Sequence, residues 1–432
     1  MTRALFGELK ANVGSGSSMR RRAHLTFRGN VKTGRHGWLR LTPAYSLHVV
    51  NQILGETKRG ERILDPFSGT GTTALASATF GIPADAVDIN PFLVWLGNLK
   101  LHRFAHGTGE DLEKTAQHIS GGLKRRRVRE LGWTPQIHQI EKWWDPETLA
   151  ALSHLYSAIT ACTEGDDIRD LLKIAFGKAM IGTSNASFSH QSMSFKAKRP
   201  IDDSQGKLFD DADLLTPRDK VFLQFNEAVA EIRETIASDV PAADGNVFLG
   251  DSRGLEAALP KESKYTKVIT SPPYPNRMSY IRELRPYMYW FGFLENGRQA
   301  GEMDWAAIGG TWGCATSNLS NWKPANGPIA YPRFDEIVRS ISKDHELLGR
   351  YVHKYFDDIK LHLQSLRKVL APGAQCFYIV GNSKFYETLL PVEEIYAALF
   401  EDAGFRGARW EVIRKRNSKK ELFEYVVYAE AP

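Results

Sequence analysis

The chain has 432 residues, which exceeds the size of an average domain and predicts two or three lobes. Hydrophobic residues make up 42% and charged residues 25%, an ordinary composition for a soluble globular protein, and no apolar run approaches the roughly 20 residues that span a bilayer. The formal net charge of +6 suits a polyanionic partner but is equally compatible with a generic basic surface.

Residues 1–36 are predicted to form a flexible basic arm. Residues 14–18 are rich in Gly and Ser, and three arginines follow at 20–22. The arm either contacts phosphates or is a solvated extension, with Met19 as an alternative start. It lacks the apolar segment of a signal peptide, and the three cysteines of the chain form no CxxC pair. We therefore expect a cytoplasmic protein without membrane partners, a disulfide framework or a metal site.

Strand and helix patterns alternate in two parts of the chain, 37–105 and 241–432, and predict one α/β domain with a parallel sheet. In the first part, strands are predicted at 62–64 and 84–88 and helices after Tyr45, at 72–80 and at 91–101. In the second part, strands are predicted at 247–249, 267–270 and 375–380, with helices at 355–370 and 391–403. Residues 371–373 are expected to end the first of these helices, and 408–415 with 421–429 to form a terminal antiparallel hairpin.

Residues 106–240 interrupt this alternation and are predicted to be an inserted helical lobe. Two apolar stripes at helical spacing mark its packing faces. The second stripe begins behind a Thr216 cap with Pro217 at the first helical position. Residues 184–213 between the helices are polar and read as a loop. The first stripe consists of Leu149, Leu152, Tyr156 and Ile159, and the second stripe consists of Val221, Phe225, Val229, Ile232 and Ile236.

The segment DPFSGTGTT, from Asp65 to Thr73, follows the first predicted strand and suits a nucleotide-like cofactor. Gly69 and Gly71 allow a sharp turn and a close backbone approach, and the next helix begins with free N–H groups. The Asp65 carboxylate could hold a positively charged amino group. The segment is neither GxGxxG nor a GK[ST] phosphate loop, so dinucleotides and ATP fit poorly.

Two further carboxylates follow the next strands. Asp88 lies at the end of the second strand, where it can accept both hydroxyls of a ribose. It also precedes Asn90 and Pro91, a helix cap, and both roles are compatible. Asp251 follows the third strand and is placed to meet an adenine amine, although it also reads as a turn residue.

The segment TSPPY, from Thr270 to Tyr274, is predicted to be a rigid clamp for a planar base. Its two prolines fix the backbone, so the Pro272 carbonyl and the Ser271 hydroxyl can both accept from one NH₂ group. Holding both protons draws the nitrogen lone pair out of ring conjugation. Tyr274 would stack on the base, and a base inside a duplex must first be flipped out. The alternative is a proline turn with a buried tyrosine.

Together the two motifs resemble the amino-methyltransferases of DNA restriction–modification systems. The resemblance extends to residues 355–383 and 41–50, about half of the chain. It implies a Rossmann-like methyltransferase fold with S-adenosyl-L-methionine as methyl donor, double-stranded DNA as substrate and a cognate restriction endonuclease as partner. Ser271 at the first clamp position resembles the N4-cytosine group, whereas the N6-adenine group usually has Asp or Asn there. The implied function is methyl transfer to the N4 amine of a flipped-out cytosine.

The motifs supply the candidate site residues. The candidate catalytic residues are Ser271, Pro272, Pro273 and Tyr274. The candidate cofactor-binding residues are Tyr45, which the resemblance places in a segment closing over the cofactor, and Asp65, Pro66, Phe67, Ser68, Gly69, Gly71, Thr72, Thr73, Asp88, Ile89, Asn90, Asp251 and Ser252. The candidate DNA contacts are Arg277, next to the clamp, and the basic run Lys124, Arg125, Arg126 and Arg127, which also reads as a solvated helix face.

Several alternatives stay open at this stage. Target recognition is assigned either to the helical lobe or to residues 275–350. An N6-adenine DNA methyltransferase, an RNA base amino-methyltransferase and a non-catalytic DNA-binding subunit are the competing functions. Cytosine C5 chemistry is rejected, because it needs a cysteine nucleophile, typically after a proline, and Cys162, Cys314 and Cys376 all follow other residues.

Overall fold

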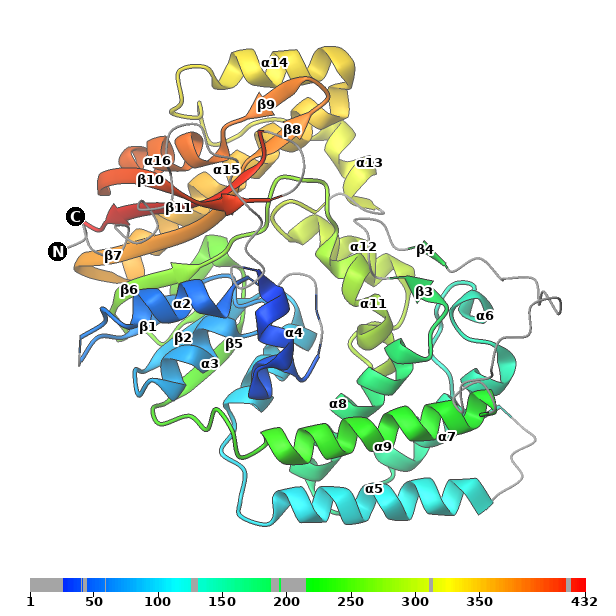
Figure 1. The fold of residues 1–432 in the computed structure, drawn as a ribbon. Helices are drawn as coiled ribbons and strands as arrows, with labels where there is room; N and C mark the ends of the chain where they lie inside the picture. The colour runs from blue at the N-terminus through cyan, green and yellow to red at the C-terminus, as the bar shows by residue number, and fades with distance from the viewer. Residues whose placement is uncertain are drawn as a thin grey trace.

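The computed structural model describes residues 26–39, 41, 45–58, 60–125, 131–187, 194–195, 215–310, 314–416 and 421–432. A central sheet carries helices on both faces, and a bundle of helices lies beside it (Figure 1). Within these ranges, no helix combines the length and the apolar character needed to cross a membrane.

Seven strands form the central sheet in the order β10-β11-β7-β6-β1-β2-β5. Strands β5, β2, β1, β6 and β7 run parallel, and the terminal hairpin β10–β11 joins the β7 edge antiparallel. This arrangement confirms the predicted Rossmann-like fold of S-adenosyl-L-methionine-dependent methyltransferases. The strands are β1 Ile63–Asp65, β2 Ala84–Asp88, β5 Gly245–Leu249, β6 Tyr265–Thr270, β7 Leu370–Gly381, β10 Arg406–Lys415 and β11 Phe423–Glu430.

Each face of the sheet has its own apolar layer, because neighbouring residues of a strand point to opposite faces. Ile269 of β6 belongs to the same buried apolar cluster as Val50 of α2, whereas Val268 belongs to another cluster with Leu363 of α15. The Asn90 side chain caps α4 by accepting from the Phe92 N–H, as predicted. The flanking helices are α2 Leu47–Leu54, α3 Thr72–Thr79, α4 Pro91–Leu101, α10 Leu255–Ala258, α15 Glu346–Val369 and α16 Val392–Asp402.

The stretch from 106 to 240 folds mainly as five helices among its described residues, and both predicted stripes are buried. The Thr216 hydroxyl accepts from the Asp219 N–H at the start of α9, which confirms the predicted cap. The helical core is continuous with α4 and with α11 (Tyr280–Trp290), because Trp290 meets Trp144 at 5.9 Å between ring centroids. The helices are α5 Thr108–Arg125, α6 Ile140–Trp143, α7 Pro146–Thr160, α8 Asp166–Gly182 and α9 Pro217–Thr235.

Three details of the sequence-based prediction were wrong. The supposed loop at 184–213 contains a two-stranded pair, β3 Ala186–Ser187 with β4 Ser194–Phe195, where it is described. Helix α15 begins at Glu346 rather than at 355, and β7 already begins at Leu370. The pairing of β6 with β7 shifts register after Leu370, and this irregularity accommodates Pro372 and Gly373.

The part of the predicted N-terminal arm that is described, from residue 26 to residue 36, is not a flexible extension. Residues 27–32 and 34–37 form short 3₁₀ turns that pack on the molecule, and residues 1–25 lie outside the described ranges. Arg35 is 1% exposed and donates to the carbonyls of Lys100, His102 and Ile236. A buried guanidinium needs such acceptors, so tertiary contacts, rather than local sequence, hold this segment in place.

Candidate active site

One cavity of about 260 Å³ joins the two predicted motifs. Gly69 of the glycine loop and Ser271 of the clamp both line it, at the carboxyl ends of β1 and β6. The direction of strand order reverses between these two strands, and ligands of open α/β sheets bind at such a point. The fold therefore brings together segments that lie about 200 residues apart.

Most predicted site residues reach the cavity, and the others lie behind it. The lining includes Tyr45, Pro66, Phe67, Gly69, Asp88, Ile89, Asn90, Asp251 and Ser252, and the clamp residues Ser271, Pro272, Pro273 and Tyr274. The predicted residues that do not line it are Asp65, Ser68, Gly71, Thr72 and Thr73, all of which are buried in the support of the glycine loop.

The glycine loop needs its glycines for conformation and for space. Gly69 and Gly71 have φ values of 52° and 77°, in the left-handed region that side chains disfavour. A Cβ on Gly71 would also lie 3.3 Å from the Cα of Gly97 in α4. From below, the buried ammonium of Lys100 donates to the Thr70 carbonyl at 2.9 Å. The loop is thus held rigidly at the N-terminus of α3.

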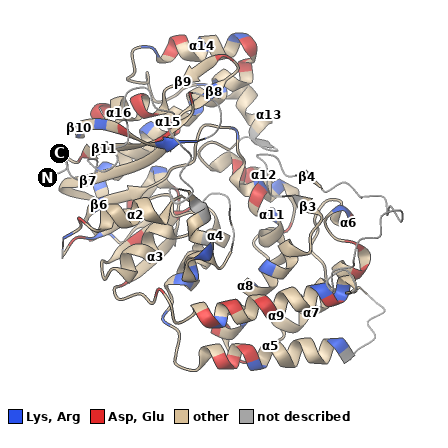
Figure 2. Cartoon of the chain, in the orientation of Figure 1, with Lys and Arg blue, Asp and Glu red and all other residues tan. Residues whose placement is uncertain are grey.

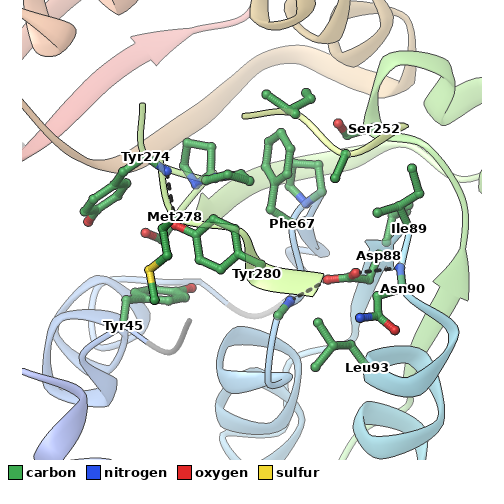
Figure 3. A pocket seen from close by; sticks show the side chains of 18 of the residues that line it. Tyr45, Phe67, Asp88, Ile89, Asn90, Leu93, Ser252, Tyr274, Met278 and Tyr280 are labelled. Carbon is green, nitrogen blue, oxygen red and sulfur yellow. Dashed lines mark hydrogen bonds between the residues drawn. The ribbon is translucent and has the colours of Figure 1, made fainter. Parts of the chain in front are cut away.

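Asp88 connects the glycine loop to the second strand. One carboxylate oxygen accepts from the Gly69 N–H at 2.8 Å and the other from the Asn90 N–H at 2.9 Å (Figure 3). Burial raises the pKa of Asp88 to about 7. Each carboxylate oxygen can accept more than one hydrogen bond, so capacity remains for the hydroxyls of a ligand.

Asp65 lies beneath the loop and is 1% exposed. One of its oxygens accepts from the Thr270 hydroxyl at 2.6 Å and from the Phe67 N–H at 3.1 Å. The other oxygen is buried without a hydrogen-bond partner in the described structure. Burial raises the pKa of Asp65 to about 6. An unsatisfied buried carboxylate oxygen is the expected counterpart of a cationic group that the protein itself does not supply.

Asp251 forms an ion pair that the sequence analysis did not predict. Its carboxylate lines the cavity but is paired with Arg253, whose Nη2 lies 2.6 Å away. Arg253 also binds Asp358 of α15 at 2.7 Å. Beside it, the His362 Nδ1–H donates to the Ser252 carbonyl at 3.0 Å, and burial lowers the pKa of His362 to about 4. In this neutral ring, Nε2 accepts from the Tyr378 hydroxyl at 2.6 Å. Asp251 therefore belongs to a fixed polar wall at this end of the cavity.

The clamp is held by long-range contacts. The Ser271 hydroxyl donates to the Ile379 carbonyl of β7 at 3.0 Å. With its hydrogen so used, the Ser271 oxygen presents lone pairs. The Pro273 carbonyl accepts from the Tyr355 hydroxyl at 2.7 Å, and the Tyr274 N–H donates to the Tyr280 hydroxyl at 3.2 Å (Figure 3).

Tyr274 is anchored by the terminal hairpin. Its hydroxyl donates to Glu424 of β11 at 3.0 Å, and Arg414 of β10 makes two hydrogen bonds to the same carboxylate. The Arg416 guanidinium lies 5.0 Å from the Tyr274 ring centroid. A Cβ on Gly381 would lie 2.8 Å from that ring, so the glycine leaves the space that the ring needs.

Sequence reasoning missed these hairpin residues and most of the segment after the clamp. Nothing in the sequence indicates that residues of the hairpin reach the site. The residues after the clamp could have been predicted from their closeness to it in the sequence. The missed lining residues include Asn276, Met278, Tyr280, Ile281, Leu284, Arg414, Arg416 and Glu424.

The predicted DNA contacts do not line the cavity. Arg277 is exposed, has a φ of 63°, and its N–H donates to the Tyr351 hydroxyl at 3.3 Å. Lys124 lies at the end of α5 farthest from the sheet, on a bundle whose basic and acidic residues are mixed (Figures 1 and 2). The side chain of Arg125 and residues Arg126 and Arg127 lie outside the described part.

The residues around the cavity fit S-adenosyl-L-methionine, the cofactor of this fold. The Asp88 carboxylate lines the cavity and suits ribose hydroxyls. Asp65 lies behind the lining, and its buried oxygen, unpaired in the described structure, places negative charge beneath the glycine loop, which favours an ammonium group there. Phe67 and Ile89 offer apolar surface for a flat base, and Phe67 is itself fixed edge-on to His362 at 4.7 Å between ring centroids.

Comparisons with known proteins point the same way, although no family model matches the chain. The chain is 22% identical to the Type II methyltransferase M.BsoBI of Geobacillus stearothermophilus, covering 93% of this chain and 85% of that protein. It is 23% identical to the Type II methyltransferase M.AvaI of Nostoc sp., over 92% and 85% of the two chains. The Type II methyltransferase M.MvaI of Kocuria varians is 18% identical over 82% and 77%.

Among solved structures, the rRNA methyltransferase aviRa of Streptomyces viridochromogenes gives a TM-score of 0.33 at 12% identity. The alignment covers 96% of this chain and 97% of that chain.

Proposed function

We propose that the protein is a restriction–modification DNA methyltransferase that modifies the exocyclic N4 amine of a flipped-out cytosine. The observation that carries this proposal is the single cavity shared by the glycine loop and the TSPPY clamp. The chain is similar over most of its length to Type II methyltransferases, and this similarity supports a DNA substrate and a cognate restriction endonuclease as partner.

S-adenosyl-L-methionine would supply an electrophilic methyl group in this cavity. Asp88 would hold its ribose, and Phe67 with Ile89 its base. Asp65 would attract its ammonium group from behind the lining of the cavity, through the charge of its buried carboxylate. Asp251 and Ser252 would close the adenine side as one wall, because Asp251 is already fixed by Arg253.

The clamp would hold and orient the amine. The Ser271 oxygen has spent its own proton on Ile379 and can accept one amine proton, while the Pro272 carbonyl accepts the other. This arrangement keeps the nitrogen lone pair directed out of the plane of the base. Because the acceptors are positioned before the base arrives, they contribute mainly through orientation and electrostatics. The surplus proton leaves to water.

The protein needs no covalent intermediate for this chemistry. Cys162 and Cys376, the cysteines whose side chains are described, both lie outside the cavity lining. Burial in β7 also raises the pKa of Cys376 well above its ordinary value, which suppresses the thiolate. Both facts favour direct transfer to the amine.

Serine at the first clamp position is the basis for choosing cytosine. Expression in a bacterial host that lacks DNA methylation, followed by sequencing with modified-base detection, tests the proposal. N4-methylcytosine at one recurring site is the expected result. N6-methyladenine would refute the choice of base.

A second assay tests the substrate class. Purified protein should transfer tritium from labelled S-adenosyl-L-methionine to duplex DNA and not to bulk tRNA. Ser271→Ala serves as the inactive control, and its cofactor affinity should match that of the unmodified protein. Transfer to tRNA alone would refute a DNA substrate.

A further inference from the structure

Helix α11 lies between two cavities. Tyr280, Ile281 and Leu284 line the catalytic cavity, whereas Arg282, Arg285 and Tyr289 line a second cavity of about 390 Å³. The two sets occupy different faces of the helix, as a period of 3.6 residues requires. The opposite wall of the second cavity comes from the helical lobe, through residues 136–139 and Trp143. In Figure 1 this is the region where α11 approaches α6 and β3.

The second cavity contains two neighbouring arginines, one of which has a buried N–H without a partner in the described part of the chain. Arg282 and Arg285 are both half-buried, and the Nε of Arg282 is fully buried without a hydrogen-bond partner among the described residues. Burial, and then the charge of Arg282, lower the pKa of Arg285. Glu283, the acidic neighbour that acts on both, is not part of the cavity lining. Two adjacent guanidinium groups in a partly enclosed space favour an anion with several oxygens.

Aromatic rings complete the lining. Trp143 and Tyr289 are buried, and Phe195 is 42% exposed and meets Trp143 edge-on at 5.4 Å between ring centroids. A free phosphate needs no such rings. Guanidinium groups next to aromatic faces instead suit a phosphate that carries a sugar and a flat base.

We propose that this second cavity binds a nucleotide of the DNA strand close to the target base, with its phosphate on Arg282 and Arg285. The proposal rests on the DNA methyltransferase function and adds to it a second contact site on the far side of α11. A helix with its side chains is about 10–12 Å wide. Phosphates of one DNA strand recur every ~3.4 Å along the axis. A strand can therefore reach both sides of α11 within about four nucleotides.

Binding of a fluorescein-labelled DNA duplex of mixed sequence, followed by anisotropy at several KCl concentrations, tests this inference. Arg282→Ala and Arg282→Gln both remove the charge, and Gln keeps part of the stem. Each is expected to weaken binding by about tenfold and to reduce the salt-dependence slope by about 1. Arg339→Ala is the matched control and should leave both values unchanged, because Arg339 is exposed on α14 (Phe334–Asp344) and donates to the Asp335 carbonyl of the same helix.

Cofactor binding distinguishes the loss of a DNA contact from the loss of the fold. Each variant should bind S-adenosyl-L-methionine as the unmodified protein does, which shows that the fold is intact. Duplex binding by an Arg282 variant with unchanged affinity and slope would overturn the inference and leave the proposed function standing. Failure of the unmodified protein itself to bind duplex DNA would overturn both.

Discussion

The two ends of the catalytic cavity are built in different ways. At the proposed cofactor end, Asp88 accepts from the N–H groups of Asn90, two residues away, and of Gly69, in the loop after the neighbouring strand β1. At the base end, Tyr274 depends on Glu424, 150 residues away. Asp88 is held by backbone N–H groups, whereas Tyr274 is held by side chains that meet only when the complete sheet has formed. The cofactor end should therefore fail when one local carboxylate is lost, and the base end when the hairpin is disturbed.

The largest effect is expected from Asp88→Ala at the cofactor end. It removes the carboxylate that would accept two hydrogen bonds from the ribose hydroxyls of the cofactor, and each such bond typically contributes about 1.5–3 kcal/mol. S-adenosyl-L-methionine affinity should fall by about 100-fold or more, measured by isothermal titration calorimetry. Glu256→Ala removes the same charge from an exposed pair with Lys368 and should have no effect. Unchanged affinity in Asp88→Ala would contradict the assignment of this end.

Glu424→Ala should have the next largest effect and act on the base end alone. It leaves the mostly buried Arg414 guanidinium without its carboxylate and the Tyr274 hydroxyl without its acceptor. Unfolding in urea should show a loss of about 3 kcal/mol. Glu424→Gln retains an acceptor for Tyr274 and should lose less. A loss below about 0.5 kcal/mol, typical of a surface substitution, would remove the contrast between the two ends.

Tyr274→Ala tests the base end by activity. Loss of a stacking ring costs about 1–3 kcal/mol, so kcat/KM for DNA should fall by roughly 10- to 100-fold. Cofactor affinity should stay nearly the same, because Tyr274 is held by the hairpin and not by the glycine loop. Tyr274→Phe keeps the ring and should lose only a few-fold. Unchanged methylation by the alanine variant would refute the stacking role.

The smallest effect is a pH dependence at the cofactor end. The pKa values of Asp65 and Asp88 are raised to about 6 and about 7, so rising pH creates the negative charges that would favour a bound cofactor under the proposed function. Affinity should increase by about tenfold between about pH 5.5 and 7.5 and then level off. Asp65→Asn should flatten the lower part of this curve. A cofactor affinity that decreases as the pH rises would contradict this prediction.

The same two carboxyls affect the stability of the cofactor-free protein in the opposite direction. Between about pH 4 and 7 they keep protons that the unfolded chain has released near its ordinary value of 3.8. Their contribution to the free energy of unfolding therefore decreases as the pH rises through that window. Asp65→Asn should remove part of this decrease in thermal melts of the protein without cofactor.

The amino-acid sequence by itself predicted most of the elements around the cavity. The strand at 84–88 and the helix at 91–101 have the predicted bounds, because Asn90 and Pro91 form a local cap. The glycine loop was predictable for the same reason, since Gly69 and Gly71 are needed for a backbone conformation that neighbouring residues determine. Local patterns also identified the clamp, although its place in the reaction stays a prediction.

Only the tertiary structure decided what completes the base end and what Asp251 can do. Arg414, Arg416 and Glu424 read as ordinary hairpin residues until β11 pairs with β7 and places them against Tyr274. Likewise, the Arg253 that pairs with Asp251 is also held by Asp358 of α15, which is 105 residues away in sequence. Backbone conformation and caps are set by residues a few positions apart, so a sequence displays them. Side-chain partners across a sheet are set by strand order and register, which arise only when the whole domain folds.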